Sequence, residues 1–195
     1  MNKINLLIIA FLTITIIVLS SCTTNNSETI NVYVNKGAVA EDPSYTLIEA
    51  PALNLKLSYP NSWEKQEDIM GIALIFLSPL EGADDTFQEN INLIIQDVSN
   101  EPITLDEYVN TNLADMDQFL NDVEINKSEK VTINGIAGHE IIYSASQGEE
   151  RLKWRQLVIL DNEKAYLLTY TAKEHTYDLY LEEVNNVINS LEITS

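Results

Sequence analysis

From residue 45 onward, apolar and polar positions follow one another in short runs that are typical of β-strands. Leu53–Tyr59 alternates strictly and stops at Pro60, which predicts a strand with one buried face. Ile72–Leu77 and Ile91–Val98 are nearly continuous apolar runs, which indicates strands that are buried on both faces. Later apolar and alternating runs predict further strands at 123–133, 139–145, 152–160 and 165–172.

Two tight turns are expected to join the later strands into hairpins. Asn134-Gly135 readily supplies the positive φ values of a two-residue hairpin turn, and Asp161–Lys164 joins the last two predicted strands. Alternate residues of a strand point to opposite faces. The apolar residues of the strand before the first turn all have odd numbers: Val123, Ile125, Val131 and Ile133. One face of this strand is therefore expected to be exposed to solvent.

The helical spacing of apolar residues occurs in two segments. Thr104 and Glu107 form a capping box, so a helix is expected to begin there, with an apolar stripe from Leu105 to Met116. Seven apolar residues between Tyr177 and Leu191 recur at the same spacing and predict a second helix. Because hairpins dominate and the two helices are well separated, we expect an α+β fold with a mainly antiparallel sheet and a helix on each face.

The start of the chain has the layout of a secretory signal. Lys3 precedes an apolar run, Leu6–Leu19, which is shorter than the roughly 20 residues needed to span a bilayer. The run ends in Leu19-Ser20-Ser21-Cys22, which resembles the lipobox of prokaryotic lipoproteins. That resemblance implies that the thiol of Cys22 takes a diacylglycerol and that Cys22 becomes the new N-terminus.

The predicted organisation has three parts. Residues 1–21 are a lipoprotein signal peptide, residues 22–44 are the lipidated cysteine with a polar tether, and residues 45–195 are one domain. Cys22 is the only cysteine, so the domain is expected to fold without a disulfide. The acyl chains would hold the protein at the cell membrane or the outer membrane, facing the extracytoplasmic side.

Acidic residues greatly outnumber basic ones, which limits the partners that the domain can have. The chain has 30 Asp and Glu against 11 Lys and Arg, a net charge of −19. Removal of residues 1–21 takes away Lys3 and no acid, so the excess of acids grows by one. This balance argues against nucleic acid and against an anionic bilayer surface, since both are bound through clustered cations. A solvated, soluble surface is the expected role of the acids.

Sequence motifs for catalysis or metal binding are not found. His139–Tyr143 begins like a zinc-protease motif, but Tyr143 stands where the second histidine is required. The chain also lacks a GxSxG elbow, a phosphate-binding loop and paired cysteines. We expect Trp63 and Trp154 to be core residues and His175 to be exposed or capping. The protein is therefore predicted not to be an enzyme and to carry no cofactor besides its acyl chains.

Two charged clusters are candidates for binding. Arg151, Lys153 and Arg155 lie within five residues and would suit an acidic partner, but they could equally pair with the domain's own acids. Glu81, Asp84 and Asp85 could offer oxygens to Ca²⁺, although their spacing is not that of an EF-hand and an ordinary acidic loop is the simpler interpretation.

Several motifs together resemble the PsbP/DcrB-like domains. They are the Tyr59-Pro60 to Trp63 pattern "YP-x-x-W", the Ile133-Asn134-Gly135 to Gly138 pattern "ING-x-x-G", and the ending from Ala165 to Leu191. The resemblance implies an α/β/α sandwich with a central antiparallel sheet. Members of the family include photosystem II extrinsic subunits and many small prokaryotic lipoproteins of unassigned role.

Three hypotheses for function follow. The first is a lipid-anchored, extracytoplasmic accessory or binding module that is non-catalytic and docks to a membrane protein complex. The second is a lipoprotein that binds a small ligand or a divalent cation such as Ca²⁺ or Mn²⁺, including a role like that of the photosystem II extrinsic subunits. The third is a hydrolase whose catalytic residues are scattered along the sequence.

Overall fold

The computed structural model of the chain describes residues 42–100 and 102–194. The predicted signal peptide, the predicted acylation site Cys22 and the predicted tether up to residue 41 lie outside the described residues.

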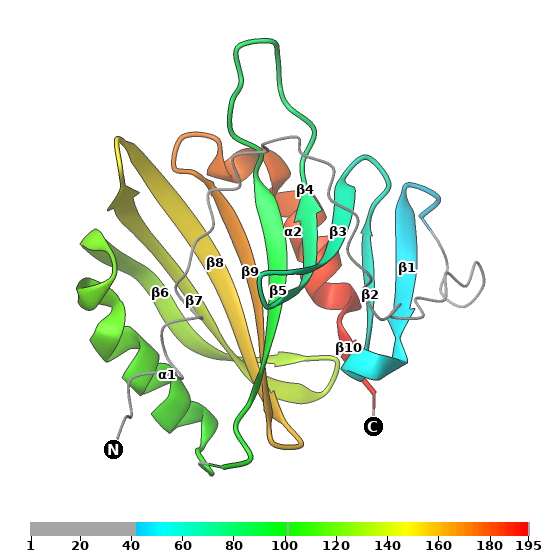
Figure 1. Cartoon of the computed structure of the whole chain (residues 1–195), viewed down its shortest axis with the longest axis vertical. Helices are drawn as coiled ribbons and strands as arrows, with labels where there is room; N and C mark the ends of the chain where they lie inside the picture. Colours follow the sequence, from blue (N-terminus) through cyan, green and yellow to red (C-terminus); the bar gives the residue numbers. More distant parts are fainter. Residues whose placement is uncertain (1–41, 101, 195) are drawn as a thin grey trace.

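A seven-stranded antiparallel sheet forms the centre of the molecule (Figure 1). Its strand order is β3-β4-β5-β9-β8-β7-β6, so a meander of three strands and a meander of four strands meet where β5 pairs with β9. The strands are β3 Glu64–Ile69, β4 Ile72–Leu77, β5 Asn90–Asp97, β6 Asn121–Ile133, β7 Ile136–Gln147, β8 Glu150–Asp161 and β9 Lys164–Lys173.

A second, smaller sheet lies beside the first. It has the order β1-β2-β10, with β1 Tyr45–Ala50, β2 Leu55–Pro60 and β10 Glu192–Ile193, and the 3-10 turn η1 Pro51–Leu53 joins β1 to β2. The strand predicted over Leu53–Tyr59 is β2, so it belongs to this small sheet and not to the central one. The sheet is completed by β10, which brings the two ends of the domain together.

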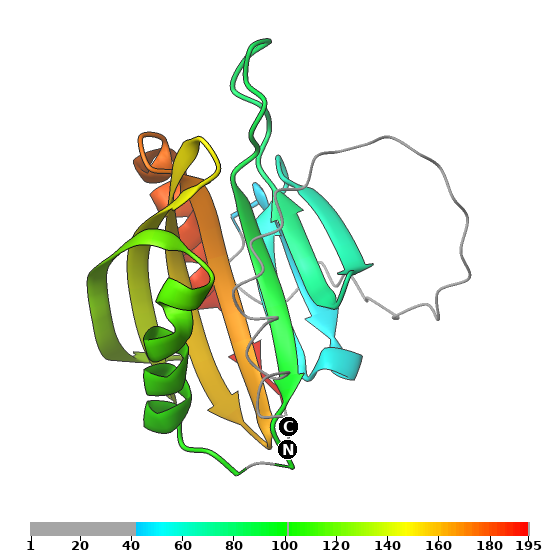
Figure 2. The same ribbon diagram turned by 60° about the vertical axis from the view of Figure 1, so that its left-hand side comes forward.

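The first helix, α1, covers one face of the central sheet (Figure 2). It spans Leu105–Asp115 and continues into the 3-10 turn η2 Met116–Gln118. The predicted capping box is confirmed: the Thr104 side chain accepts from the backbone N–H of Glu107, whose carboxylate in turn accepts from the backbone N–H of Thr104. Tyr108, Val109 and Met116 are buried against β7 and β8, as the apolar stripe predicted.

The second helix lies on the opposite face of the central sheet, beside the small sheet (Figure 1). The α-helix α2 spans Leu181–Ser190 and is preceded by the 3-10 turn η3 Tyr177–Tyr180, so it begins later than the apolar spacing predicted. Thr176 stands at the N-cap position of η3, but its hydroxyl donates to the carboxylate of Glu89 at 2.6 Å and does not cap this turn. The apolar residues Val184, Val187 and Ile188 are buried as expected.

The two faces of the central sheet carry two hydrophobic cores. The core on the α2 side includes Trp63 and side chains of both sheets, and the core on the α1 side includes Trp154. Both tryptophans are buried, which confirms their predicted role. The arrangement agrees with the predicted α+β fold and its helix on each face.

Strand β6 differs from the prediction because it contains bulges. The pairing shifts between Ile125 and Lys127, so Asn126 is an extra residue that reverses the faces of all residues after it. Val123 therefore packs in the α1-side core, whereas Val131 packs against the α2-side core, although the two share one parity. Ile125 is exposed. The prediction that the four apolar residues of this strand share one face is therefore wrong.

The Asn-Gly turn between β6 and β7 also holds the end of α2. Asn134 has a φ of 49° and Gly135 a φ of 84°, as a two-residue hairpin turn requires. The Asn134 side-chain amide donates to the backbone carbonyl oxygens of Asn189 and Leu191, both at 2.9 Å. This turn thus supplies hydrogen-bond donors to the carbonyl groups at the C-terminus of α2.

Replacement of Asn134 should loosen this junction. We expect Asn134→Ala to lower the free energy of unfolding by about 1–2 kcal/mol, since it removes both hydrogen bonds and places alanine at a positive φ. Asn162→Ala is a matched control, because Asn162 also has a positive φ in a hairpin turn but its amide contacts only neighbouring Asp161. Urea unfolding of both variants should show the larger loss for Asn134→Ala; equal losses would show that the amide does not stabilise α2.

Candidate functional site

The three cations that the sequence groups together lie side by side on strand β8. Arg151, Lys153 and Arg155 alternate along this strand, so all three point to the face that carries α2. We call them the β8 cation row. The structure shows what each of the three contacts.

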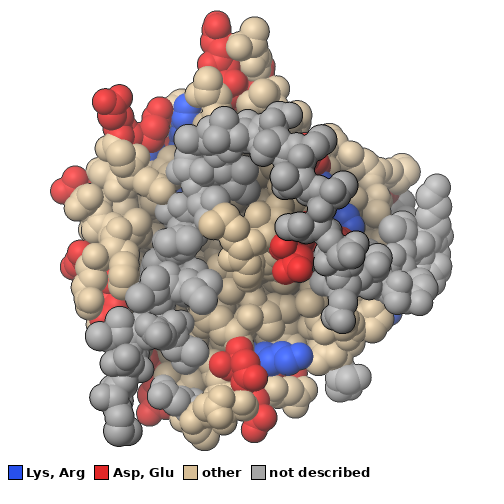
Figure 3. Space-filling model, in the orientation of Figure 1, with Lys and Arg blue, Asp and Glu red and all other residues tan. Residues whose placement is uncertain are grey.

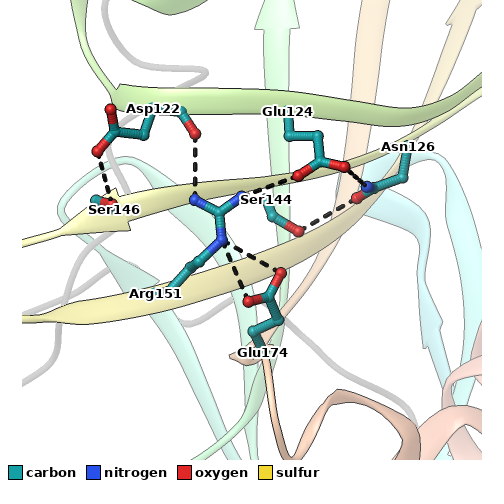
Figure 4. A network of polar contacts seen from close by, with 7 residues as sticks. All are labelled: Asp122, Glu124, Asn126, Ser144, Ser146, Arg151 and Glu174. Carbon is teal, nitrogen blue, oxygen red and sulfur yellow. Dashed lines mark hydrogen bonds and ion pairs between the residues drawn. The ribbon is translucent and has the colours of Figure 1, made fainter.

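Arg151 is enclosed by groups from two other segments, β6 and the residue after β9 (Figure 4). Its guanidinium donates to the carboxylates of Glu124 and Glu174 and to the backbone carbonyl of Asp122. The ion-pair distances are 3.2 Å to both carboxylates. Glu124 lies on β6 and Glu174 follows β9. Arg151 therefore links β8 to β6 and to the chain that follows β9.

Arg155 contributes to a buried charged cluster under α2. Its Nε donates to Glu140 Oε1 at 2.7 Å, and its Nη1 donates to the Asn185 side chain on α2 at 2.6 Å. The second oxygen of Glu140 accepts from Lys127 Nζ at 2.7 Å. Lys127 reaches this face because the bulge at Asn126 reverses strand β6. We call Lys127, Glu140 and Arg155 the Glu140 cluster.

The carboxyl group of Glu140 is charged in spite of its burial. Its side chain is only 8% exposed, and this burial by itself would raise its pKa. Hydrogen bonds from Lys127 and Arg155, together with their positive charges, outweigh the burial and hold the pKa of Glu140 below its ordinary value. The two cations in turn have a buried counter-ion, so the cluster is an internal structural element of the sheet.

Lys153 has different surroundings from the two arginines. Its Nζ lies 4.5 Å from the ring centroid of Tyr177, which is a cation–π contact. The Tyr177 hydroxyl is buried and has no hydrogen-bond partner within the described part of the chain. Burial raises the pKa of this hydroxyl to about 12. Both arginines of the row form ion pairs, whereas Lys153 forms none within residues 42–100 and 102–194.

The sequence left open whether the row pairs internally or docks an acidic partner. Arg151 and Arg155 do pair with acids of the same domain, at the distances given above. Docking through the row remains a prediction, and it would depend chiefly on Lys153, since the arginines already have carboxylates beside them.

The acidic loop between β4 and β5 is organised by its own hydrogen bonds. Asp85 accepts from the backbone N–H groups of Glu81 and Phe87, and these two bonds are the main reason that the pKa of Asp85 is lowered. Glu81 and Asp84 are exposed. Within the described residues, no group of three or more histidine, cysteine, aspartate or glutamate side chains has the geometry to hold a metal ion.

Strands β6 and β7 bring together a serine and a histidine that the sequence did not link. Ser128 Oγ lies 2.8 Å from His139 Nε2. Burial, the largest cause, lowers the pKa of His139, which favours the neutral imidazole that a general base needs. However, His139 Nδ1 has no hydrogen-bond partner in the described residues, so no carboxylate orients the ring as in a serine hydrolase. The pair by itself lacks the orienting acid of a catalytic triad.

Comparison with known proteins identifies the family of this domain. The family model named DcrB matches residues 80–190, which is more than half of the chain. The chain belongs to the DcrB family. In this DcrB-family domain, two of the motifs on which the resemblance was based are structural: Trp63 packs edge-on against Tyr180, and Asn134 holds the end of α2.

Solved structures share the fold of the DcrB-family domain. The cyanobacterial PsbP of Synechocystis sp. PCC 6803 is similar over 90% of this chain and 98% of its own, with a TM-score of 0.52 and 17% identity. LpqN of Mycobacterium tuberculosis, described as involved in cell envelope biogenesis, is similar over 72% and 83%, with a TM-score of 0.56 and 13% identity. No curated protein matches the chain by sequence.

A third similar structure is a Pseudomonas aeruginosa protein of unknown function, PA94. It covers 75% of this chain and 94% of its own, with a TM-score of 0.56 and 18% identity. At such identities these likenesses show the fold, which is the PsbP-like α+β fold that the sequence motifs predicted. Family and fold fit an accessory module. Across the described residues, no helix is long and apolar enough to cross a bilayer.

Proposed function

We propose that this DcrB-family protein is a lipid-anchored, non-catalytic accessory module that docks to a membrane protein complex on the extracytoplasmic side. The observation that carries the proposal is the position of Cys22, which follows the apolar run Leu6–Leu19 after two serines and precedes the folded domain. An acylated cysteine there would leave some twenty residues of chain between the membrane anchor and strand β1.

The character of the domain supports a binding role. Some of its charged side chains form internal pairs such as the Glu140 cluster, and among the described residues the Ser128–His139 pair lacks an orienting carboxylate. The motifs on which the resemblance was based include Trp63, which packs on Tyr180, and Asn134, which holds the end of α2. Such a domain has a rigid surface to offer to a partner, and the acyl chains would concentrate that surface at the membrane.

Docking through the β8 cation row can be tested without disturbing its ion pairs. We expect Lys153→Gln to reduce the amount of membrane protein that co-purifies with the lipid-anchored chain, because Lys153 is the row's ammonium without a carboxylate beside it. The measurement is quantitative mass spectrometry of detergent-solubilised membranes after affinity purification.

The matched control is Lys130→Gln. Lys130 is more exposed than Lys153 and pairs with Asp106 on α1, away from the β8 cation row. Its replacement should leave the co-purified proteins unchanged. Equal yields for Lys153→Gln and the unmodified protein would show that the partner does not contact this row.

A further inference from the structure

The β4–β5 loop projects from one end of the molecule (Figures 1 and 2). This loop and the 3-10 turn η3 each carry one exposed leucine. Leu80 lies in this loop and is 52% exposed, and Leu179 lies in η3 and is 58% exposed. Isolated apolar side chains on a surface need no explanation, but two large ones on adjoining, fixed segments do. Hydrogen bonds hold these two segments in place and join them to each other.

The loop of residues 78–89 is held closed at its base. The backbone N–H of Ser78 donates to the carbonyl of Glu89 at 2.8 Å, and the Gln88 side chain donates to the carbonyl of Ser78. Towards the tip, Asp85 accepts from the backbone N–H groups of Glu81 and Phe87. A long loop with such internal bonding is compact and is often a binding element.

The same loop is attached to η3. Glu89 is buried, and its carboxylate accepts from the hydroxyls of Ser78 at 3.3 Å and of Thr176 at 2.6 Å. The Tyr180 hydroxyl lies 3.5 Å from the carbonyl oxygen of Pro79. Leu80 follows Pro79 in the chain and Leu179 precedes Tyr180, so this contact joins the two segments that carry the leucines. We call Pro79, Leu80, Leu179 and Tyr180 the Leu80–Leu179 surface.

Acidic residues frame this surface. Glu81 and Asp84 follow Leu80 in the loop, and Asp178 precedes Leu179; all three are exposed. Figure 3 shows acidic side chains at the tip of the projecting loop. The nearby cation Lys173 is mostly buried and lies 3.6 Å from Glu150. A partner that covers the leucines must therefore place positive charge around an apolar centre.

We propose that the Leu80–Leu179 surface binds a basic patch of a protein partner, with the two leucines at the centre of the contact. This inference rests on the proposed docking function and adds the chemistry of the partner's surface. An anionic bilayer surface is disfavoured by the acidic frame, and a second copy of the chain would bring the same charges together. The surface is distinct from the β8 cation row, which would take an acidic partner.

The test uses a photo-reactive benzophenone amino acid in the full, lipid-anchored chain within the cells that make it. It replaces Leu80 in one variant, Leu179 in a second and Met70 in a third. Met70 is the matched control, since it is an apolar side chain, 74% exposed, on the turn between β3 and β4. We expect one protein to be crosslinked from positions 80 and 179 but not from position 70, through a segment rich in Lys and Arg.

Charge reversal supplies the second arm of the test. Asp84→Lys together with Asp178→Lys should reduce the crosslinked product at least about fivefold, because like charges then face each other. The proposal is overturned if the product is a dimer of the chain, a lipid adduct or absent, or if charge reversal leaves its yield unchanged. If the chain still purifies with a membrane complex in those cases, only the surface is misassigned; if no complex is found at all, the docking function itself is wrong.

Discussion

Glu140→Gln should lower the free energy of unfolding by about 3 kcal/mol. The substitution keeps the size of the side chain but leaves Arg155, which is 17% exposed, without its buried carboxylate, whereas Lys127 keeps its ion pair with Glu129. Removal of one member of a buried ion pair is costly because the remaining charge stays desolvated. Chemical denaturation of the domain, followed by tryptophan fluorescence, would measure the loss.

Two further variants separate the buried pair from surface charge effects. Glu124→Gln removes an acid that is 66% exposed and pairs with Arg151, so its loss should be below about 1 kcal/mol. Glu140→Leu combined with Arg155→Leu replaces the pair by apolar groups and should recover much of the lost stability. A loss from Glu140→Gln as small as that from Glu124→Gln would contradict the structural role of the Glu140 cluster.

In the unmodified protein, low pH should remove the stability that the ionised Glu140 cluster contributes. The pKa of Glu140 is lower in the folded chain than its ordinary value of 4.5, so the ionised cluster stabilises the fold above that pH. This contribution is lost as the pH falls from about 4.5 through the folded pKa. The stability curves of the unmodified protein and of Glu140→Gln should therefore converge in acid.

Trp154→Ala should destabilise the domain by about 3–5 kcal/mol. Trp154 is completely buried in the α1-side core, where its ring stacks on Tyr143 with 5.0 Å between the ring centroids. Alanine would leave a cavity between α1 and the sheet that the surrounding strands cannot close. The midpoint of urea unfolding, combined with an unchanged slope, would give this loss directly.

Trp154→Phe is the matched control for that prediction. The indole Nε1 is buried and has no hydrogen-bond partner in the described residues, so its removal relieves a desolvation cost. Phenylalanine also keeps an aromatic ring to stack on Tyr143. We expect a loss below about 1.5 kcal/mol. A loss close to that of Trp154→Ala would mean that the indole N–H has a partner, such as a buried water.

The elements that the sequence predicted well are those whose signals are local. The capping box of Thr104 and Glu107, the apolar face of α2 and the Asn134-Gly135 turn each depend on residues close together in the chain. Strand β3 was not predicted, because Glu64–Ile69 is almost entirely polar. It pairs with β4 at the edge of the central sheet, where polar side chains can remain in contact with water.

The contacts that the sequence could not predict are long-range. The small sheet is completed by the pairing of β10 with β2, which lie at opposite ends of the domain. The alternation of Arg151, Lys153 and Arg155 predicted that they share a face, but their partners Glu124, Glu140 and Glu174 come from other segments. The bulge at Asn126, which brings Lys127 to Glu140, has no signal in the hydrophobic pattern.

The most direct test of the proposed function is the mass of the N-terminal peptide of the mature protein isolated from membranes. We predict that this peptide begins at Cys22 and carries a diacylglycerol on its sulfur, and that Cys22→Ser moves the protein out of the membrane fraction. A free thiol at Cys22, or a Cys22→Ser protein that stays with the membrane, would contradict the account of a lipid-anchored docking module.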